Sequence, residues 1–175
     1  MPTIGVAVAI PEPWATELQD YRTAVGDTTA TMIPTHITLV PPTDVDVVHL
    51  AEVEKHLEEV AAEAEGFCVH LRGTGTFRPV SPVVFVSLAE GISQCEQLAG
   101  ACRRGPLDVD LQYPYHPHVT IAHHLEDPLL DRAFEELADF ECEFDVPGFD
   151  LYVHDSDAGW QPTRHFPLQA APAAS

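Results

Sequence analysis

Positively charged side chains are scarce in this 175-residue chain. Lys and Arg number 8 against 28 Asp and Glu, which gives a formal net charge of −20 at pH 7. A protein that binds long nucleic acids over a broad surface needs clustered Lys and Arg to displace the counterions of the phosphates. The composition therefore excludes an extended nucleic-acid-binding surface.

Cysteine is also rare, and its spacing argues against a cysteine-based metal or redox site. The chain contains no Cys-x-x-Cys pair. Cys95 and Cys102 lie two helical turns apart, too far for a disulfide within one helix. We predict that Cys68, Cys95, Cys102 and Cys142 are reduced core residues. The chain also lacks a Gly-x-Ser-x-Gly elbow, a P-loop and a dinucleotide-binding fingerprint.

Long hydrophobic runs are absent. No run approaches the roughly 18 apolar residues of a membrane span, and the first apolar run, Ile4 to Ile10, lacks the basic flank of a signal peptide. We therefore expect no membrane segment and a cytoplasmic location. With 45% hydrophobic residues, a chain of this length can bury a core as one domain or as two small lobes. We expect a monomer.

The first half of the chain carries the apolar patterns of three strands and two helices. In order, they are a strand at 3–10, a helix at 14–25, a strand at 36–40, a helix at 50–64 and a strand at 67–77. Pro41-Pro42 is expected to end the second strand, and Asp44 or Asp46 can cap the helix that follows. Gly73 and Gly75 predict a bend or bulge in the third strand.

The second half repeats this order of elements. They are a strand at 83–88, a helix at 92–102, a strand at 118–122, a helix that begins at 128 and extends to 137 or 140, and an extended stretch at 141–153. Asp127 is the expected cap of the second helix, with Pro128 at its first position. The repeat indicates a duplicated strand–helix–strand–helix–strand unit.

The duplication suggests one bilobal domain over residues 1–168. We place the lobes at about 1–80 and 81–168, and we leave open whether they exchange strands. Residues 160–168 are expected to add an edge strand. The Ala-rich tail, residues 169–175, is expected to be disordered.

One short motif occurs in both halves. It reads Thr35-His36-Ile37-Thr38-Leu39 in the first half and Pro117-His118-Val119-Thr120-Ile121 in the second, with 82 positions between the two histidines. On a strand, His36 and Thr38 would share one face about 7 Å apart, and the apolar residues between them would enter the core. Chance would give only about 0.15 copies of this pattern in such a chain. A pseudo-twofold axis would bring both copies into one central cleft.

These paired motifs on a duplicated unit resemble the two-histidine (2H) phosphoesterase superfamily, in particular its 2′-5′ RNA ligase and cyclic nucleotide phosphodiesterase branch. The resemblance covers residues 3 to about 168. It implies an α+β fold with two antiparallel sheets around a central cleft and helices on the outside. It also implies cleavage of 2′,3′-cyclic phosphates or related phosphodiesters without metal or other cofactor, in RNA processing. The implied ligand is a cyclic nucleotide or a short RNA 3′ end.

The residues themselves suit this chemistry. Hydrolysis of a cyclic phosphodiester needs a base that activates water and an acid that protonates the departing ribose oxygen. His36 and His118 can fill these roles near neutral pH, and the hydroxyls of Thr38 and Thr120 can donate hydrogen bonds to the non-bridging oxygens. Which histidine is the acid is left open. The reverse reaction exchanges the two roles and would be an energy-independent 2′-5′ ligation.

Arg78, Tyr115 and His123 are further candidates for substrate binding. Related sequences often carry an arginine five residues after the second motif histidine, where this chain has His123; Arg78 or Arg164 could substitute for that positive charge. Tyr115 could stack on a base, as could Tyr113 or Phe77.

The distribution of acidic residues favours an anionic ligand. None of the 28 Asp and Glu lies in 28–43, 66–89 or 111–125, the segments proposed to build the cleft. Strands are poor in carboxylates in any case, so this is supporting evidence only.

Two other classes of function stay open at this point. The chain could be a non-catalytic nucleotide or RNA-binding module that keeps the fold. It could also bind a metal through the histidines clustered at 116, 118, 123 and 124, although Pro117 interrupts that stretch and no carboxylate lies within it. The motif pair favours a phosphodiesterase, and we predict no metal ligands.

Overall fold

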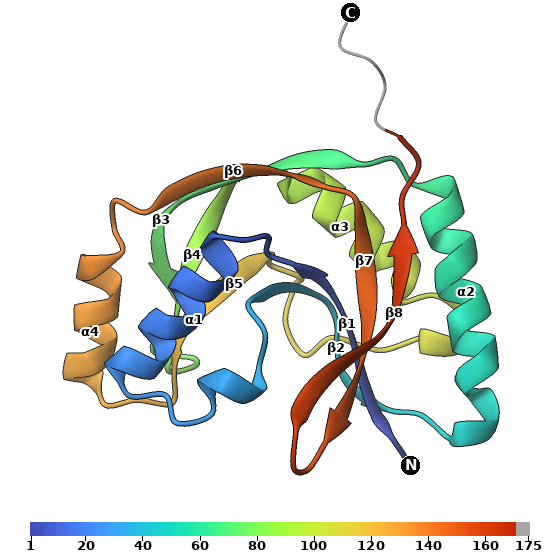
Figure 1. Ribbon diagram of the computed structural model, residues 1–175, viewed down its shortest axis with the longest axis horizontal. Helices are drawn as coiled ribbons and strands as arrows, with labels where there is room; N and C mark the ends of the chain where they lie inside the picture. The colour runs from blue at the N-terminus through green and yellow to red at the C-terminus, as the bar shows by residue number, and fades with distance from the viewer. Residues whose placement is uncertain (171–175) are drawn as a thin grey trace, which may run out of the picture.

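The computed structural model describes residues 1–170, whose strands form two four-stranded antiparallel sheets flanked by four α-helices (Figure 1). The strand order is β2-β1-β7-β8 in one sheet and β5-β4-β3-β6 in the other. We call them the β1 sheet and the β4 sheet. The predicted α+β class with two antiparallel sheets is confirmed.

The bounds of the strands are β1 (Thr3–Ala9), β2 (His36–Asp44), β3 (Phe67–Thr76), β4 (Val83–Glu90), β5 (His118–His123), β6 (Glu141–Val146), β7 (Gly148–Asp155) and β8 (Gly159–Pro167). The bounds of the helices are α1 (Trp14–Val25), α2 (Leu50–Glu63), α3 (Ile92–Cys102) and α4 (Asp127–Glu136).

Each sheet takes strands from both halves of the chain. Strand β3 pairs with β4 and β6, whereas β7 pairs with β1 and β8. The single extended stretch that we predicted over 141–153 is wrong, because it divides at Pro147 into β6 and β7, which belong to different sheets. Proline has no backbone N–H to donate to a neighbouring strand. The chain therefore crosses from one sheet to the other at a residue that could not donate a hydrogen bond within either sheet.

The helices cover the two sheets in pairs. Helices α1 and α4 contact strands of the β4 sheet, and α2 and α3 contact strands of the β1 sheet (Figure 1). Each helix buries its apolar stripe, as Leu18 and Leu57 illustrate at 0% exposure. The motif strands β2 and β5 are edge strands of their sheets. β2 contacts α3, and β5 contacts α1 and α4.

Several boundaries differ from the sequence prediction. Strand β2 runs through Pro41-Pro42 to Asp44 instead of ending at the prolines. It is an edge strand and its register with β1 shifts between Ile4 and Val6, so the missing N–H groups are tolerated. Asp46 caps a short 3₁₀ turn, Val47–His49, that precedes α2, so the cap lies one turn earlier than expected.

Helix α4 differs at both ends. It ends at Glu136, with Leu137 as its C-terminal cap, and does not reach Phe140. Its N-terminal cap is Glu126 in an extended conformation, and Asp127 is already the first helical residue. The predicted bend in β3 is confirmed, because Gly73 has φ +73° and the pairing with β4 shifts between Leu71 and Thr74.

The C-terminal residues only partly meet the expectation of a disordered tail. Gln169 donates its backbone N–H to Ala64 (2.9 Å) and accepts one from Gly66 (2.8 Å), so it is held against the end of α2. Residues 171–175 of that predicted tail lie outside the described residues. Among the helices of residues 1–170, none has the length and apolarity to cross a membrane. The four cysteines are free, with Cys68 half-buried and the other three buried.

Candidate functional site

The two motif strands lie against each other at facing edges of the sheets. β2 and β5 are in contact, and the hydroxyl of Tyr115, just before β5, donates a hydrogen bond to the Thr38 carbonyl at 2.7 Å. The apolar motif residues are fully buried, as predicted: Ile37, Leu39, Val119 and Ile121. The alternate residues are half-buried on the other face of their strands: His36, Thr38, His118 and Thr120.

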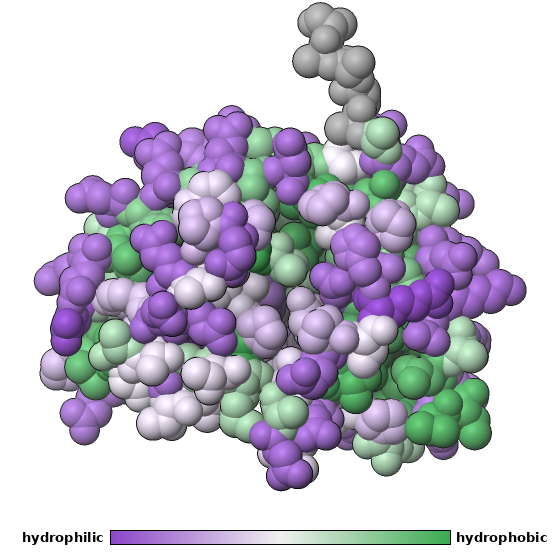
Figure 2. Space-filling view, in the orientation of Figure 1, coloured by the Kyte–Doolittle hydropathy of each residue, from purple (hydrophilic) through white to green (hydrophobic). Residues whose placement is uncertain are grey.

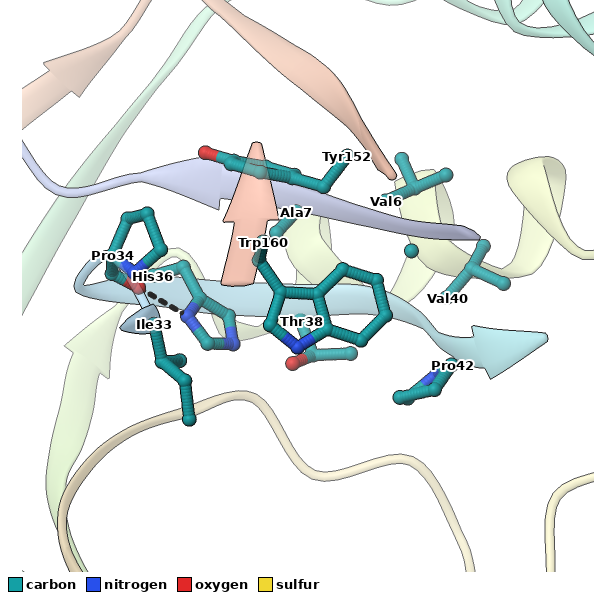
Figure 3. Close-up of a pocket in the computed structure, with 11 residues that line it drawn as sticks. Val6, Ala7, Ile33, Pro34, His36, Thr38, Val40, Pro42, Tyr152 and Trp160 are labelled. Carbon is teal, nitrogen blue, oxygen red and sulfur yellow. Dashed lines mark hydrogen bonds between the residues drawn. The ribbon is translucent and has the colours of Figure 1, made fainter. Parts of the chain in front are cut away.

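Both motif histidines are held in the same way. Nδ1 of His36 lies 2.6 Å from the carbonyl oxygen of Pro34, and Nδ1 of His118 lies 2.7 Å from that of His116. A carbonyl oxygen can only accept, so Nδ1 carries the hydrogen and Nε2 of the neutral ring is left with a lone pair. Figure 3 shows the second ring nitrogen of His36 directed away from Pro34 and toward Thr38. Each ring can therefore exchange a proton through Nε2.

Burial shifts the titration of both rings. It lowers the pKa of His36 below 6.5, and the positive charge of Arg22 lowers this pKa further. It also lowers the pKa of His118 to about 4, with smaller contributions from the charges of His116 and His36. The charge of His36 makes a small contribution to the lowered pKa of His118, as expected for rings on two strands that are in contact. Both rings are neutral in the substrate-free protein at pH 7.

Aromatic rings surround His118. The ring of Phe77 meets it edge-on at a centroid distance of 4.8 Å and an angle of 89°, and Phe85 lies 5.2 Å away. These rings exclude water from one side of the imidazole, which accounts for the desolvation that lowers its pKa. The hydroxyls of Thr38 and Thr120 accept and donate no hydrogen bond within residues 1–170, so both can bind a ligand.

A pocket opens beside His36 (Figure 3). Its empty volume is about 440 Å³ including the open solvent at its mouth, and Thr38, Tyr152 and Trp160 join His36 in its wall. Its remaining walls are apolar or backbone: Gly5, Val6, Ala7, Ile33, Pro34, Val40 and Pro42. Such a mixture of a flat aromatic wall and a few polar groups suits a ligand with a planar ring and a polar end.

Trp160 and Tyr152 were missed in the sequence analysis. Trp160 pairs with His154 across the β7–β8 hairpin, and its indole ring lies over Gly5 of β1, where an added Cβ would be 3.4 Å from Cζ3. Gly5 and Ala7 are small residues on the same face of β1, and this pattern could have predicted free space above that strand. No pattern near residue 160 indicated that Trp160 would fill the space.

The three predicted substrate-binding residues differ in their surroundings. Arg78 donates a hydrogen bond from Nη1 to Asp131 on α4 at 2.8 Å and lies 3.6 Å from Asp127, so two carboxylates already neutralise its charge. Tyr115 is half-buried between its hydrogen bond to Thr38 and the guanidinium of Arg103, which lies 5.6 Å above its ring. Neither lines the pocket beside His36.

His123 lies at the far end of β5 from His118. Five residues of strand separate the two, about 17 Å, so they do not face the same ligand atom. Its ring is tilted by 44° against that of His124, with 3.6 Å between the ring centroids. Arg164, the other proposed substitute, is paired with Glu58 of α2 at 2.9 Å.

The four clustered histidines do not converge on one point. His116 lies beside His118 with a centroid distance of 6.1 Å, whereas the other two lie at the opposite end of β5. Within residues 1–170, the one group of His, Cys, Asp and Glu ligand atoms close enough to share an ion is Cys68, Glu90 and Glu143. The histidine cluster therefore lacks the geometry of a metal site.

Many exposed acidic side chains lie on helices α2 and α4. Six glutamates of α2 and α4 are exposed: Glu52, Glu58, Glu59, Glu63, Glu135 and Glu136. Figure 2 shows hydrophilic side chains over much of the face that includes these helices. A long polyanion would meet this charge before it reached the motif strands.

The fold and the two motif strands place the protein in the two-histidine class of phosphoesterases. A family model described as the 2′-5′ RNA ligase superfamily matches residues 10–158. The chain belongs to this family.

Relatives in sequence have names that indicate phosphoesterase activity. An Oceanobacillus iheyensis protein, named provisionally as a phosphoesterase, is 30% identical over 137 residues, which cover 77% of this chain and 76% of that protein. A similarly named protein of Bacillus cytotoxicus is 28% identical over 141 residues, covering 78% of this chain and 80% of that protein.

Solved structures share the fold over the whole chain. The protein TT0787 of Thermus thermophilus has a TM-score of 0.70 at 22% identity, covering 97% of this chain and 99% of that one. E. coli LigT complexed with NADP⁺ has a TM-score of 0.66 at 19% identity, covering 96% and 99%. LigT complexed with 3′-AMP has a TM-score of 0.61 at 21% identity, with the same coverage.

Proposed function

We propose that this protein is a metal-independent phosphodiesterase that opens 2′,3′-cyclic phosphates of nucleotides or RNA ends to 2′-phosphates. The observation that carries the proposal is the matched pair of Nδ1 hydrogen bonds, 2.6 Å at His36 and 2.7 Å at His118. Each bond fixes one ring and leaves its Nε2 free for proton transfer. Family membership supports the choice of a phosphoester as substrate.

The reaction needs two proton transfers and one displacement at phosphorus. One imidazole takes a proton from water as the water oxygen forms a bond to phosphorus. The bond from phosphorus to the ribose 3′-oxygen breaks, and the other imidazolium donates its proton to that oxygen. The product is a 2′-phosphate, and the two histidines have exchanged protonation states. The hydroxyls of Thr38 and Thr120 stabilise the charge that builds on the non-bridging oxygens.

The same steps allow ligation. The 5′-hydroxyl of a second RNA can take the place of water. The same base then removes the proton of this hydroxyl, the bond from phosphorus to the ribose 3′-oxygen breaks, and the same acid protonates that oxygen. This reaction would join the two RNA ends through a 2′-5′ bond without an energy source. Hydrolysis is the reaction that dilute solution favours.

The pocket beside His36 suits the nucleoside part of the substrate. A base placed against the indole of Trp160 would leave the ribose phosphate near His36 and Thr38, which line the same pocket. LigT, which shares the fold, has been crystallised with the nucleotides 3′-AMP and NADP⁺. A mononucleotide or a short 3′ end fits this arrangement better than a long RNA.

Product analysis tests the proposal. The protein is incubated with 2′,3′-cyclic AMP in the presence of EDTA, and the products are separated by chromatography. We expect 2′-AMP as the sole product. Binding of 2′-AMP without turnover of any cyclic nucleotide or cyclic-ended oligomer would instead indicate a non-catalytic nucleotide-binding module.

A further inference from the structure

One buried ion pair lies outside the proposed reaction. Arg22 near the end of α1 and Asp27 are 3% and 7% exposed, the lowest values of any ion pair in residues 1–170. Nε and Nη2 of Arg22 donate to Oδ2 of Asp27 at 3.2 and 2.7 Å. Oδ1 of Asp27 accepts from the backbone N–H and the hydroxyl of Thr29 at 2.9 and 2.7 Å. Both carboxylate oxygens are therefore fully used within the protein.

Asp27 begins the segment that leads to the hydrogen-bond partner of His36. Its carbonyl accepts from Ala30, and the carbonyl of Ala30 accepts from Ile33 at 3.2 Å and from the side chain of Gln19 at 3.0 Å. The next residue is Pro34, whose carbonyl binds Nδ1 of His36. The backbone of Asp27 is thus linked to the His36 ring through two backbone hydrogen bonds of 3.3 and 3.2 Å, the peptide bond from Ile33 to Pro34, and the 2.6 Å contact of the Pro34 carbonyl.

The far end of this segment is tied to the same helix. The hydroxyl of Thr35 donates to the carbonyl of Ala15 in α1 at 2.8 Å, and its carbonyl accepts from Ile10 at 3.2 Å. Helix α1 also contacts β5, the second motif strand. The guanidinium of Arg22 is close enough to both strands to lower the pKa of His36 on β2 and that of His123 on β5.

We propose that the buried Arg22–Asp27 pair is a positioning element for His36. It fixes residues 27–34 as one unit, which holds the Pro34 carbonyl against Nδ1 and presents Nε2 to the substrate phosphate. Arg22 is too buried to touch the substrate, so it acts through His36. The proposal rests on the proposed function, because it gives His36 a proton-transfer role that requires this tautomer and orientation.

The test is a double substitution that removes the pair but keeps the core filled, Arg22→Met/Asp27→Leu. Replacing a buried ion pair with apolar residues of similar size is often neutral or stabilising. We expect kcat on 2′,3′-cyclic AMP to fall by about 10- to 100-fold with KM changed less than about twofold, because a mispositioned catalytic group loses rate and not substrate binding. The matched control is the exposed pair of α4, Arg132→Gln/Glu136→Gln, which should leave kcat unchanged.

NMR titration of the His36 ring gives a second readout that needs no substrate. In the double variant we expect the His36 pKa to rise and ¹⁵N shifts to show loss of the single Nδ1–H tautomer. If the double variant does not fold, Asp27→Asn is the second variant, because it keeps an oxygen for Thr29 and the charge of Arg22. We expect it to give a smaller fall in kcat and a smaller loss of the Nδ1–H tautomer, and to lower the His36 pKa because the charge of Arg22 is no longer neutralised. Unchanged kcat and an unchanged His36 titration in a folded variant would overturn the positioning role. Absence of cyclic nucleotide turnover in the wild-type protein would overturn the proposed function, and the titration would still test the positioning of His36.

Discussion

The Nδ1 atom of His36 lies 2.6 Å from the carbonyl oxygen of Pro34, two residues earlier in the chain. His118 makes the equivalent contact to the residue two positions before it, at 2.7 Å. Two halves that share little other sequence thus hold their histidines by the same local geometry. Because each contact occupies Nδ1, the proposed catalysis depends on Nε2 of both rings.

Loss of a motif hydroxyl should slow the reaction without unfolding the protein. Thr38→Val and Thr120→Val each remove one hydrogen bond to a charged oxygen, so we expect kcat to fall about 10- to 1000-fold. Thr→Ser at either position keeps the hydroxyl and should restore most of the rate. Thr23→Val, on the exposed side of α1, is the control. Full activity of the Thr38→Val/Thr120→Val protein would remove the hydroxyls from the mechanism.

A plot of kcat/KM against pH should be bell-shaped, with its maximum below pH 6.5. Turnover needs one neutral and one protonated imidazole, and the pKa of both rings is lowered, that of His118 to about 4. kcat/KM should therefore fall as pH rises from 6.5 to 8, because the acid loses its proton. The bound phosphate favours the imidazolium, so the kcat profile should lie at higher pH than that of kcat/KM. A kcat/KM that increases up to pH 8 would contradict the assignment.

Trp160 should contribute to nucleotide binding more than to chemistry. Stacking on an aromatic side chain contributes about 1–3 kcal/mol per base, so Trp160→Ala should raise KM for a cyclic mononucleotide by about 5- to 100-fold. Trp160→Phe keeps a ring and should have a smaller effect. We expect kcat to change by less than about twofold for both variants. A KM equal to that of the wild type in Trp160→Ala would place the base elsewhere.

The value of kcat/KM should depend on the length of an RNA substrate, because helices α2 and α4 are acidic. A long RNA would lay phosphates along the exposed glutamates of α2 and α4, where like charges repel and few cations are available. We expect kcat/KM at low salt to fall as cyclic-ended RNA lengthens beyond a few nucleotides, and added salt to reduce this penalty by screening. Cyclic-ended oligomers measured at two ionic strengths provide the test. A steep rise with length at low salt would show that long RNA is the preferred substrate.

The local features of the fold could be predicted from the sequence. The alternation at His36, Ile37, Thr38 and Leu39 identified both the strand and its two faces, because side chains on a strand alternate by steric necessity. The left-handed cap of α1 was visible as Gly26, which has φ +119°. These features depend on a few neighbouring residues.

The features that could not be predicted depend on contacts between distant segments. Trp160 reaches the pocket only because β8 pairs with β7 and β7 with β1, a register that no local pattern contains. Arg22 has the spacing of an ordinary helix residue, and charged residues on helices are usually solvated, so its burial against Asp27 had no signal in the sequence. The strand that crosses between sheets at Pro147 is a further example.

The most direct test compares the wild-type protein with a His36→Ala/His118→Ala variant on a panel of 2′,3′-cyclic phosphates, with EDTA present throughout. The variants His36→Ala and His118→Ala should each lower turnover by about 10² to 10⁴, because each removes one proton-transfer partner. The double variant should be inactive with an unchanged melting temperature, and His49→Ala, an exposed histidine before α2, should match the wild type. We predict EDTA-resistant turnover that requires both histidines. Wild-type turnover in the double variant, or turnover abolished by EDTA and restored by zinc or manganese, would contradict the two-histidine mechanism.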